Sequence, residues 1–220
     1  MIIAAAVCPH PPMLVPEIAQ GAAEDLDELR RACDAAVHDL LAQEPQHIVV
    51  IGEGPAARFW DNNAGGSLKP YGVDLHVGGV TEELPLSLTI GAWLLDRFGW
   101  TGARAYATGD VDPKGRTALL VMADGSAKRS TGAPGYFDGR AEAFDQLISA
   151  ALAAGDAHTL ESLDEGLSLD LWAAGAQPLK LLGRMVVAEM AKSASVAAQL
   201  RYNAAPFGVG YWVANWSLTG

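Results

Sequence analysis

Residues 1–17 read MIIAAAVCPHPPMLVPE, a short apolar run that is broken by Pro9-His10-Pro11-Pro12. The run Ile2–Val7 has the length and composition of a strand that is buried on both faces. The proline-rich segment after it cannot continue a strand or enter a helix interior, because proline lacks the backbone N–H and restricts the residue before it. His10 is therefore predicted to lie on a rigid turn at the carboxyl end of the first strand.

This position gives His10 two possible roles. In open α/β sheets, ligands bind at the carboxyl ends of the strands, so the imidazole could face a cleft and hold a metal ion or polarise a substrate. It could equally cap a tight turn and hydrogen-bond to the backbone. The local sequence does not choose between these two interpretations.

A second strand follows a helix and completes a βαβ unit. Apolar residues recur at three- and four-residue steps over about residues 22–43, which predicts an amphipathic helix. His47–Ile51 is a second apolar run, and it ends at Gly52-Glu53-Gly54-Pro55. The two strands are expected to be parallel, with a right-handed crossover. Glu53 and His10 would then leave the same edge of the sheet and could lie close together.

The rest of the chain continues the α/β pattern. Further strands are predicted at about 73–77, 103–108, 117–123, 196–202 and 209–216, further helices at about 85–98, 140–154, 156–163, 167–172 and 178–190, and an exposed loop at 56–70. No linker or repeat divides the sequence. We therefore expect one domain over residues 1–220, with a central, mostly parallel or mixed sheet flanked by helices.

Composition narrows the classes of function. The chain has 220 residues and a formal net charge of −11, which argues against a nucleic-acid-binding protein because such proteins need a basic surface. No apolar stretch is long enough for a membrane span or has the form of a signal peptide, so a cytoplasmic location is expected. Cys8 and Cys33 are expected to be small core residues rather than a disulfide.

No short motif identifies a reaction. The sequence contains no HExxH, CxxC, GxxxxGK[ST] or GxSxG pattern. The best candidates are polar residues at predicted strand ends: His10 as a catalytic residue, and Glu53, Asp124 and Ser126 as substrate-binding residues. Asp124-Gly125-Ser126 could also be an ordinary strand-to-loop turn.

Several segments, taken in order, resemble one family. Pro9–Pro12, Ile48–Pro55, Asp124–Ala127, Gly135–Asp138 and Ala174–Leu179 are similar to class III extradiol ring-cleavage dioxygenases of the LigB-like type and to their Memo-like relatives. This resemblance covers most of the chain and implies the LigB-like α/β fold of the extradiol dioxygenases. In active members it implies non-haem Fe(II), held by two histidines and a carboxylate, with a further histidine as acid and base.

The family's functional positions are mostly replaced in this sequence. His10 matches the first metal ligand, and Glu53 is the only possible ligand in the turn where the second histidine should lie. The acid/base position falls at about Ala127 and the third metal ligand near Ala174, and alanine can perform neither role. One of the four functional positions is therefore kept.

Three hypotheses follow. The first is a divergent member that does not cleave rings, needs no cofactor, and keeps a cleft for a small molecule or a partner protein. The second is a metal-dependent oxidoreductase that cleaves a catechol-type ring, with His10 and Glu53 as ligands of Fe(II) or, if Asp124 joins them, of a harder ion such as Mn²⁺ or Mg²⁺. The third is a metal-free hydrolase or lyase in which His10 is the base and Glu53 or Asp124 orients it.

The aromatic carboxyl-terminal segment bears on assembly. Tyr211, Trp212 and Trp216 could form a homo-oligomer interface or belong to the core. The predicted strand has occupied positions on both faces, which favours the core. We retain a homo-oligomer as an alternative to a monomer.

Overall fold

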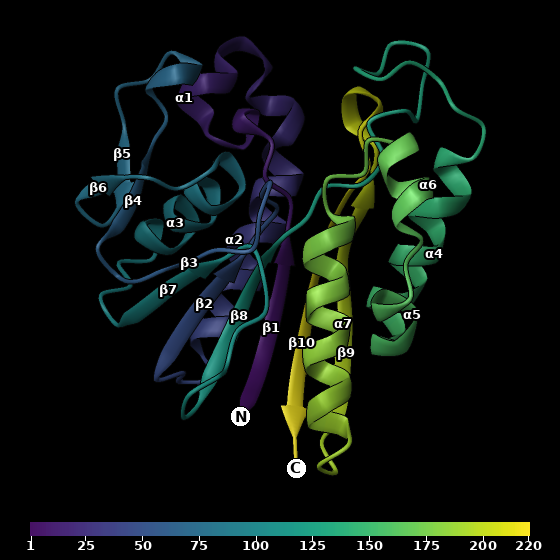
Figure 1. Cartoon of the computed structure of the whole chain (residues 1–220). Coiled ribbons are helices and arrows are strands. Elements are labelled where there is room, and N and C mark those ends of the chain that lie inside the picture. Colours follow the sequence, from purple (N-terminus) through teal and green to yellow (C-terminus); the bar gives the residue numbers. More distant parts are fainter.

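A seven-stranded mixed sheet runs through the centre of the molecule (Figure 1). The structure is a computed structural model that describes residues 1–220. The strand order is β3-β7-β2-β8-β1-β10-β9. The strands are β1 (Ile2–Cys8), β2 (His47–Ile51), β3 (Phe59–Trp60), β7 (Ala103–Ala107), β8 (Thr117–Met122), β9 (Ser195–Ala204) and β10 (Tyr211–Thr219). The four central strands β7, β2, β8 and β1 are parallel, and the other three run antiparallel to their neighbours.

Helices cover both faces of this sheet, which confirms the predicted α/β fold in one domain. The helices are α1 (Pro16–Ala19), α2 (Asp27–Leu41), α3 (Leu86–Arg97), α4 (Ala141–Ala154), α5 (Ala157–Glu161), α6 (Glu165–Asp170) and α7 (Ala176–Met190). The core beneath α2 and α3 and the core beneath α4, α5 and α7 are separate clusters of buried side chains. Strand β1 contributes to both: Ile3 and Ala6 belong to one cluster and Ala5 and Val7 to the other.

The predicted βαβ unit is present with one refinement. Strands β1 and β2 are parallel as expected, but β8 lies between them and pairs with both. Asp124, which follows β8, therefore lies between the two strand ends that carry His10 and Glu53. This order is what places the three candidate residues side by side.

The prediction of an exposed loop at 56–70 is wrong. The segment contains β3 and β4 (Ala64–Ser67), and β4 pairs with β5 (His76–Gly78) and β6 (Thr81–Glu82) in a small second sheet. This small sheet packs on α3. A Cβ atom on Gly66 would overlap the side chain of Thr89, so the glycines that suggested a loop instead allow a close approach to the helix.

Several predicted helix boundaries also shift. Helix α2 begins at Asp27 rather than at residue 22, because the residues before it form two short 3₁₀ turns, Gln20–Ala22 and Glu24–Leu26. Helix α7 begins at Ala176, two residues before the predicted proline. Such differences are typical of helix ends, where α and 3₁₀ turns compete.

Burial confirms two further predictions. Trp212 and Trp216 are fully enclosed, and the indole N–H of Trp216 donates to the Leu152 carbonyl at 2.8 Å, so this aromatic segment belongs to the core. Cys8 and Cys33 are buried free thiols. No helix combines the length and the apolar character that a membrane span requires.

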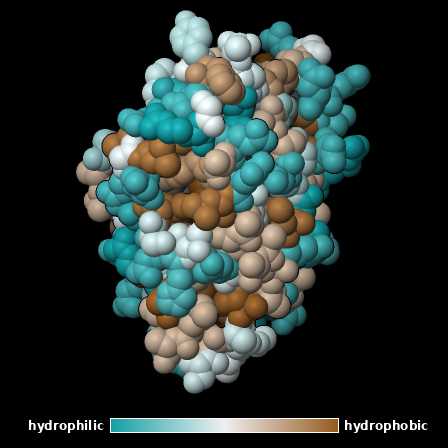
Figure 2. Space-filling model, turned by 90° about the vertical axis from the view of Figure 1, so that its right-hand side faces the viewer, coloured by the Kyte–Doolittle hydropathy of each residue, from teal (hydrophilic) through white to brown (hydrophobic).

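The face formed by α4 to α6 carries apolar patches among hydrophilic side chains (Figure 2). Leu147 on α4 and Leu169 on α6 are the exposed large aliphatic side chains of these helices. Leu169 also reaches the cleft described below.

Candidate functional site

Three neighbouring parallel strands bring His10, Glu53 and Asp124 together. His10 follows β1, Glu53 follows β2 and Asp124 follows β8, so all three leave the carboxyl edge of the sheet. The Nε2 atom of His10 lies 3.7 Å from Glu53 Oε1, and its Nδ1 atom lies 3.5 Å from Asp124 Oδ1. The expected proximity of His10 and Glu53 is confirmed, and Asp124 joins them.

The backbone fixes His10 in this place. Its backbone N–H donates to Asp124 Oδ1 at 2.7 Å, and a 3₁₀ turn at Pro12–Leu14 begins directly after the proline segment. The side chain is almost completely buried. A charge-assisted hydrogen bond from a rigid turn holds the imidazole more firmly than side-chain packing alone would.

The imidazole of His10 is the most buried of the three side chains and lies between the two carboxyl groups. The side chain of Asp124 is 14% exposed and that of Glu53 is 47% exposed, with the buried imidazole between them. The Nδ1 atom of His10 is buried and has no hydrogen-bond partner. Both nitrogen–oxygen distances exceed the usual hydrogen-bond length, so a small side-chain movement would be needed to close either contact.

Charge interactions with Asp124 and Glu53 favour the protonated form of the His10 imidazole. Burial lowers the pKa of His10, but Asp124 and Glu53 raise it by more in sum, so that the pKa lies above its ordinary value of 6.5. Burial raises the pKa of Asp124 as well, against the opposing effect of His10. The two carboxyl groups therefore favour the charged form of the imidazole, against the cost of its burial.

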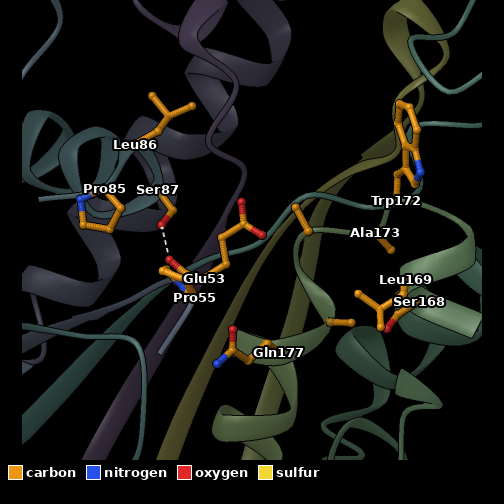
Figure 3. A pocket seen from close by; sticks show the side chains of 13 residues that line it. Glu53, Pro55, Pro85, Leu86, Ser87, Ser168, Leu169, Trp172, Ala173 and Gln177 are labelled. Atoms are coloured by element: carbon orange, nitrogen blue, oxygen red, sulfur yellow. Dashed lines mark hydrogen bonds between the residues drawn. The ribbon is translucent and has the colours of Figure 1, made fainter. Parts of the chain in front are cut away.

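A cleft of about 750 Å³ opens next to Glu53 (Figure 3). Glu53, Gly54 and Pro55 form one side, which we call the strand-end wall. Ser168, Leu169, Trp172 and Ala173 form the opposite side, which we call the helix wall. Pro85, Leu86 and Ser87, at the start of α3, lie on the same side of the cleft as Glu53 (Figure 3), and the Ser87 hydroxyl donates to the Glu53 backbone carbonyl at 3.3 Å.

Glu53 is the only charged side chain that lines this cleft. His10 and Asp124 lie behind it and do not line the cleft themselves. Any bound molecule would therefore meet the Glu53 carboxylate first, with the imidazole as its second neighbour. The arrangement is suited to a relay in which a buried charge pair supports one exposed acid/base group.

Ser126 does not take the position expected of a substrate-binding residue. It is fully buried, its hydroxyl donates to the Leu171 carbonyl at 2.8 Å, and its backbone N–H donates to Asp145 Oδ1 at 2.9 Å. These bonds tie the end of β8 to α4, through Asp145, and to the segment before α7, through Leu171. Ser126 therefore supports the strand end, as in the alternative turn interpretation.

The donor atoms do not fit the three-ligand iron centre that the resemblance implies. The two nitrogens of His10 face different carboxylates, so a metal ion at Nε2 could gain Glu53 but not Asp124. Ala174, at the position expected for the third ligand, does line the cleft, but it offers no donor atom. No group of three or more His, Cys, Asp or Glu side chains is arranged to hold a metal ion, whereas iron with open coordination positions needs three.

The helix wall supplies residues that sequence reasoning did not select. Trp172 is 57% exposed, lines the cleft and has a positive φ of 53°. The sequence alone does not show whether Trp172 is exposed or buried. A tryptophan that follows leucines at helical spacing is more often a core residue. Its neighbours Ala173-Ala174-Gly175 are too small to cover it, and that pattern could have indicated exposure.

Comparison with known proteins does not assign the chain to a family. No protein-family model matches it, and a search of curated proteins finds no match either. The function therefore has to be argued from the geometry of the cleft.

Proposed function

We propose that this protein binds a small organic molecule in the cleft beside Glu53 and exchanges a proton with it, and that it does not cleave aromatic rings. The observation that carries the proposal is the line Asp124–His10–Glu53, in which each imidazole nitrogen faces a different carboxylate. In fold terms, we infer a divergent LigB-like protein of the extradiol dioxygenase type.

The geometry assigns a distinct role to each member of the line. Glu53 touches the bound molecule, because it alone of the three lines the cleft. His10 lies behind it and exchanges a proton with its carboxylate through Nε2. Asp124 accepts the His10 backbone N–H and faces Nδ1, which fixes the orientation of the ring and stabilises its charged form.

Ring cleavage is disfavoured by the ligand count. Only His10 Nε2 and Glu53 face one another, which is one ligand short of the family's set, and the position of the acid/base histidine holds Ala127. Loss of a positioned acid/base group typically costs about 10²–10⁴-fold in rate. We therefore derive no step that passes through a metal ion.

Metal analysis tests the second part of this proposal. Protein purified without chelator, and protein incubated anaerobically with Fe(II) and desalted, would be assayed for iron content and for oxygen uptake with catechol. We expect neither stoichiometric iron nor catechol-dependent oxygen uptake. Stoichiometric iron together with ring cleavage would overturn the proposal and favour the metal-dependent oxidoreductase.

A binding screen tests the first part. A panel of small organic molecules would be screened by thermal shift, and the hits measured by titration calorimetry against wild type, Glu53→Gln and Glu142→Gln. Glu142 is a matched control because it is an exposed glutamate on α4, away from the cleft. We expect Glu53→Gln to weaken the hits about tenfold or more, through loss of a charged hydrogen bond, and the control to leave them unchanged. The proposal would be contradicted if the hits bound wild type and Glu53→Gln with equal affinity.

A further inference from the structure

A second chamber continues the cleft along α7. It has a volume of about 430 Å³, and it shares Ser168, Leu169, Ala176 and Gln177 with the chamber beside Glu53. The four shared lining residues show that the two chambers adjoin one another. A molecule longer than a single ring could therefore occupy both.

The second chamber is lined by two cationic side chains on one face of α7 and by their two acidic partners, Glu165 and Asp110. Lys180 and Arg184 lie one turn apart on α7, and both line the chamber. Lys180 Nζ pairs with Glu165 at 2.6 Å, and Arg184 pairs with Asp110 at 3.1 Å. The first chamber, by contrast, contains only the negative charge of Glu53.

The two acidic partners are easily replaced. The side chains of Glu165 and Asp110 are 76% and 69% exposed, so each can turn to solvent without burying an unpaired charge. Exposed ion pairs contribute little to stability. A ligand anion can therefore take the place of either carboxylate at small cost.

Lys180 is held in place independently of its acidic partner. Its side chain is only 21% exposed, and Nζ also donates to the Leu163 carbonyl at 3.1 Å. The ammonium group therefore stays at the chamber wall when Glu165 moves away. A fixed ammonium beside an arginine is suited to an anionic group such as a carboxylate or a phosphate.

We propose that the second chamber binds the anionic group of the ligand, and that the ligand is an elongated organic acid or phosphate ester whose uncharged or basic end reaches Glu53. This inference rests on the proposed function for the polarity of the whole ligand. Like-charge repulsion from Glu53 disfavours the opposite orientation. The anion site itself depends only on Lys180 and Arg184.

Titration calorimetry with inorganic pyrophosphate and with citrate tests the anion site at low ionic strength, where exposed charges are least screened. We expect wild type to bind at least one probe, and the double variant Lys180→Gln/Arg184→Gln to bind it about tenfold or more weakly. Lys192→Gln is the matched control, since Lys192 follows α7 and lines neither chamber. The tighter probe distinguishes phosphate from carboxylate chemistry.

A second variant keeps the test decisive if the double variant does not fold. Glu165→Gln removes the competing carboxylate and should strengthen binding of the probe. Absence of binding to wild type, or equal binding by wild type, Glu165→Gln and the double variant, would overturn the anion site. Because Glu53→Gln should not weaken binding of either probe, failure of the anion site and failure of the Glu53 proposal give different results.

Discussion

The strand-end wall and the helix wall of the cleft are built in different ways. The strand-end wall continues buried parallel strands, and hydrogen bonds fix the residues behind it, His10 and Asp124. The helix wall combines two buried small residues, Ser168 and Ala173, with two exposed large side chains, Leu169 and Trp172, and Trp172 has a left-handed backbone conformation. The difference indicates that hydrogen bonds fix the residues behind the first wall, whereas the second wall retains backbone strain at Trp172. Under the proposed function, the first wall would hold the proton-exchanging group and the second would contact the ligand.

The largest expected effect is on the strand-end wall. Asp124→Ala removes the acceptor of the His10 backbone N–H and the buried partner of its imidazole. We expect a loss of about 3 kcal/mol in the free energy of unfolding, because a buried donor and a buried charge are left uncompensated. Urea denaturation measures this loss.

Asp110→Ala is the matched control for this prediction. Asp110 is an exposed carboxylate whose ion pair lies in the second chamber. Its removal should change the free energy of unfolding by about 0.5 kcal/mol or less. Equal effects of the two substitutions would show that Asp124 is held no more firmly than an exposed carboxylate.

The second prediction concerns Gly175, where the backbone before α7 contacts the backbone at the end of β8. Gly175, immediately before α7, donates its backbone N–H to the Asp124 carbonyl at 2.7 Å, and a Cβ atom there would lie 2.5 Å from that oxygen. Gly175→Ala should force the helix away from the strand end and cost about 2 kcal/mol. It should also weaken ligand binding, because the helix wall moves relative to Glu53.

A glycine in open space provides the control for Gly175. Gly139 has no atom within 4 Å of an added Cβ atom. Gly139→Ala should therefore leave the free energy of unfolding within about 0.5 kcal/mol of wild type. Thermal and urea unfolding of both variants would show whether the close contact at Gly175, rather than the loss of a glycine, sets the spacing of the walls.

The sequence predicts the strand-end wall far better than the helix wall, for a physical reason. Buried parallel strands leave an apolar run, and their carboxyl ends must share one edge, so the proximity of His10 and Glu53 follows from the pattern. The burial of Gly66 leaves no apolar signal, because a glycine at a close backbone contact looks like a glycine in a loop. The packing of α6 and of the segment before α7 determines that Trp172 is exposed and Ser126 is buried. Hydrophobic periodicity within a single element does not report such packing.

The third prediction concerns pH. The pKa of His10 in the folded protein is above 6.5, so above pH 6.5 the folded state binds more protons than the unfolded state. The stabilisation from charged His10 is complete below pH 6.5 and is lost as the pH rises through the folded pKa. Stability measured by urea denaturation should fall over this window in wild type, and the fall should be smaller in His10→Gln. A slope that the substitution leaves unchanged would show that His10 is not held charged.

The smallest effect is expected from the helix wall itself. Trp172 has a φ of 53°, a conformation that disfavours side chains other than glycine by about 1 kcal/mol, and its ring is exposed apart from contact with Lys128 and the cleft. Trp172→Gly relieves the backbone strain but loses the packing of the buried part of the ring, so the two effects oppose one another and the free energy of unfolding should change by less than about 2 kcal/mol. Binding of the panel hits should nevertheless weaken, as calorimetry would show. Backbone strain that brings no gain in stability is expected where a side chain contacts a ligand. If Trp172→Gly lowered the free energy of unfolding by more than about 2 kcal/mol, Trp172 would instead be a structural residue.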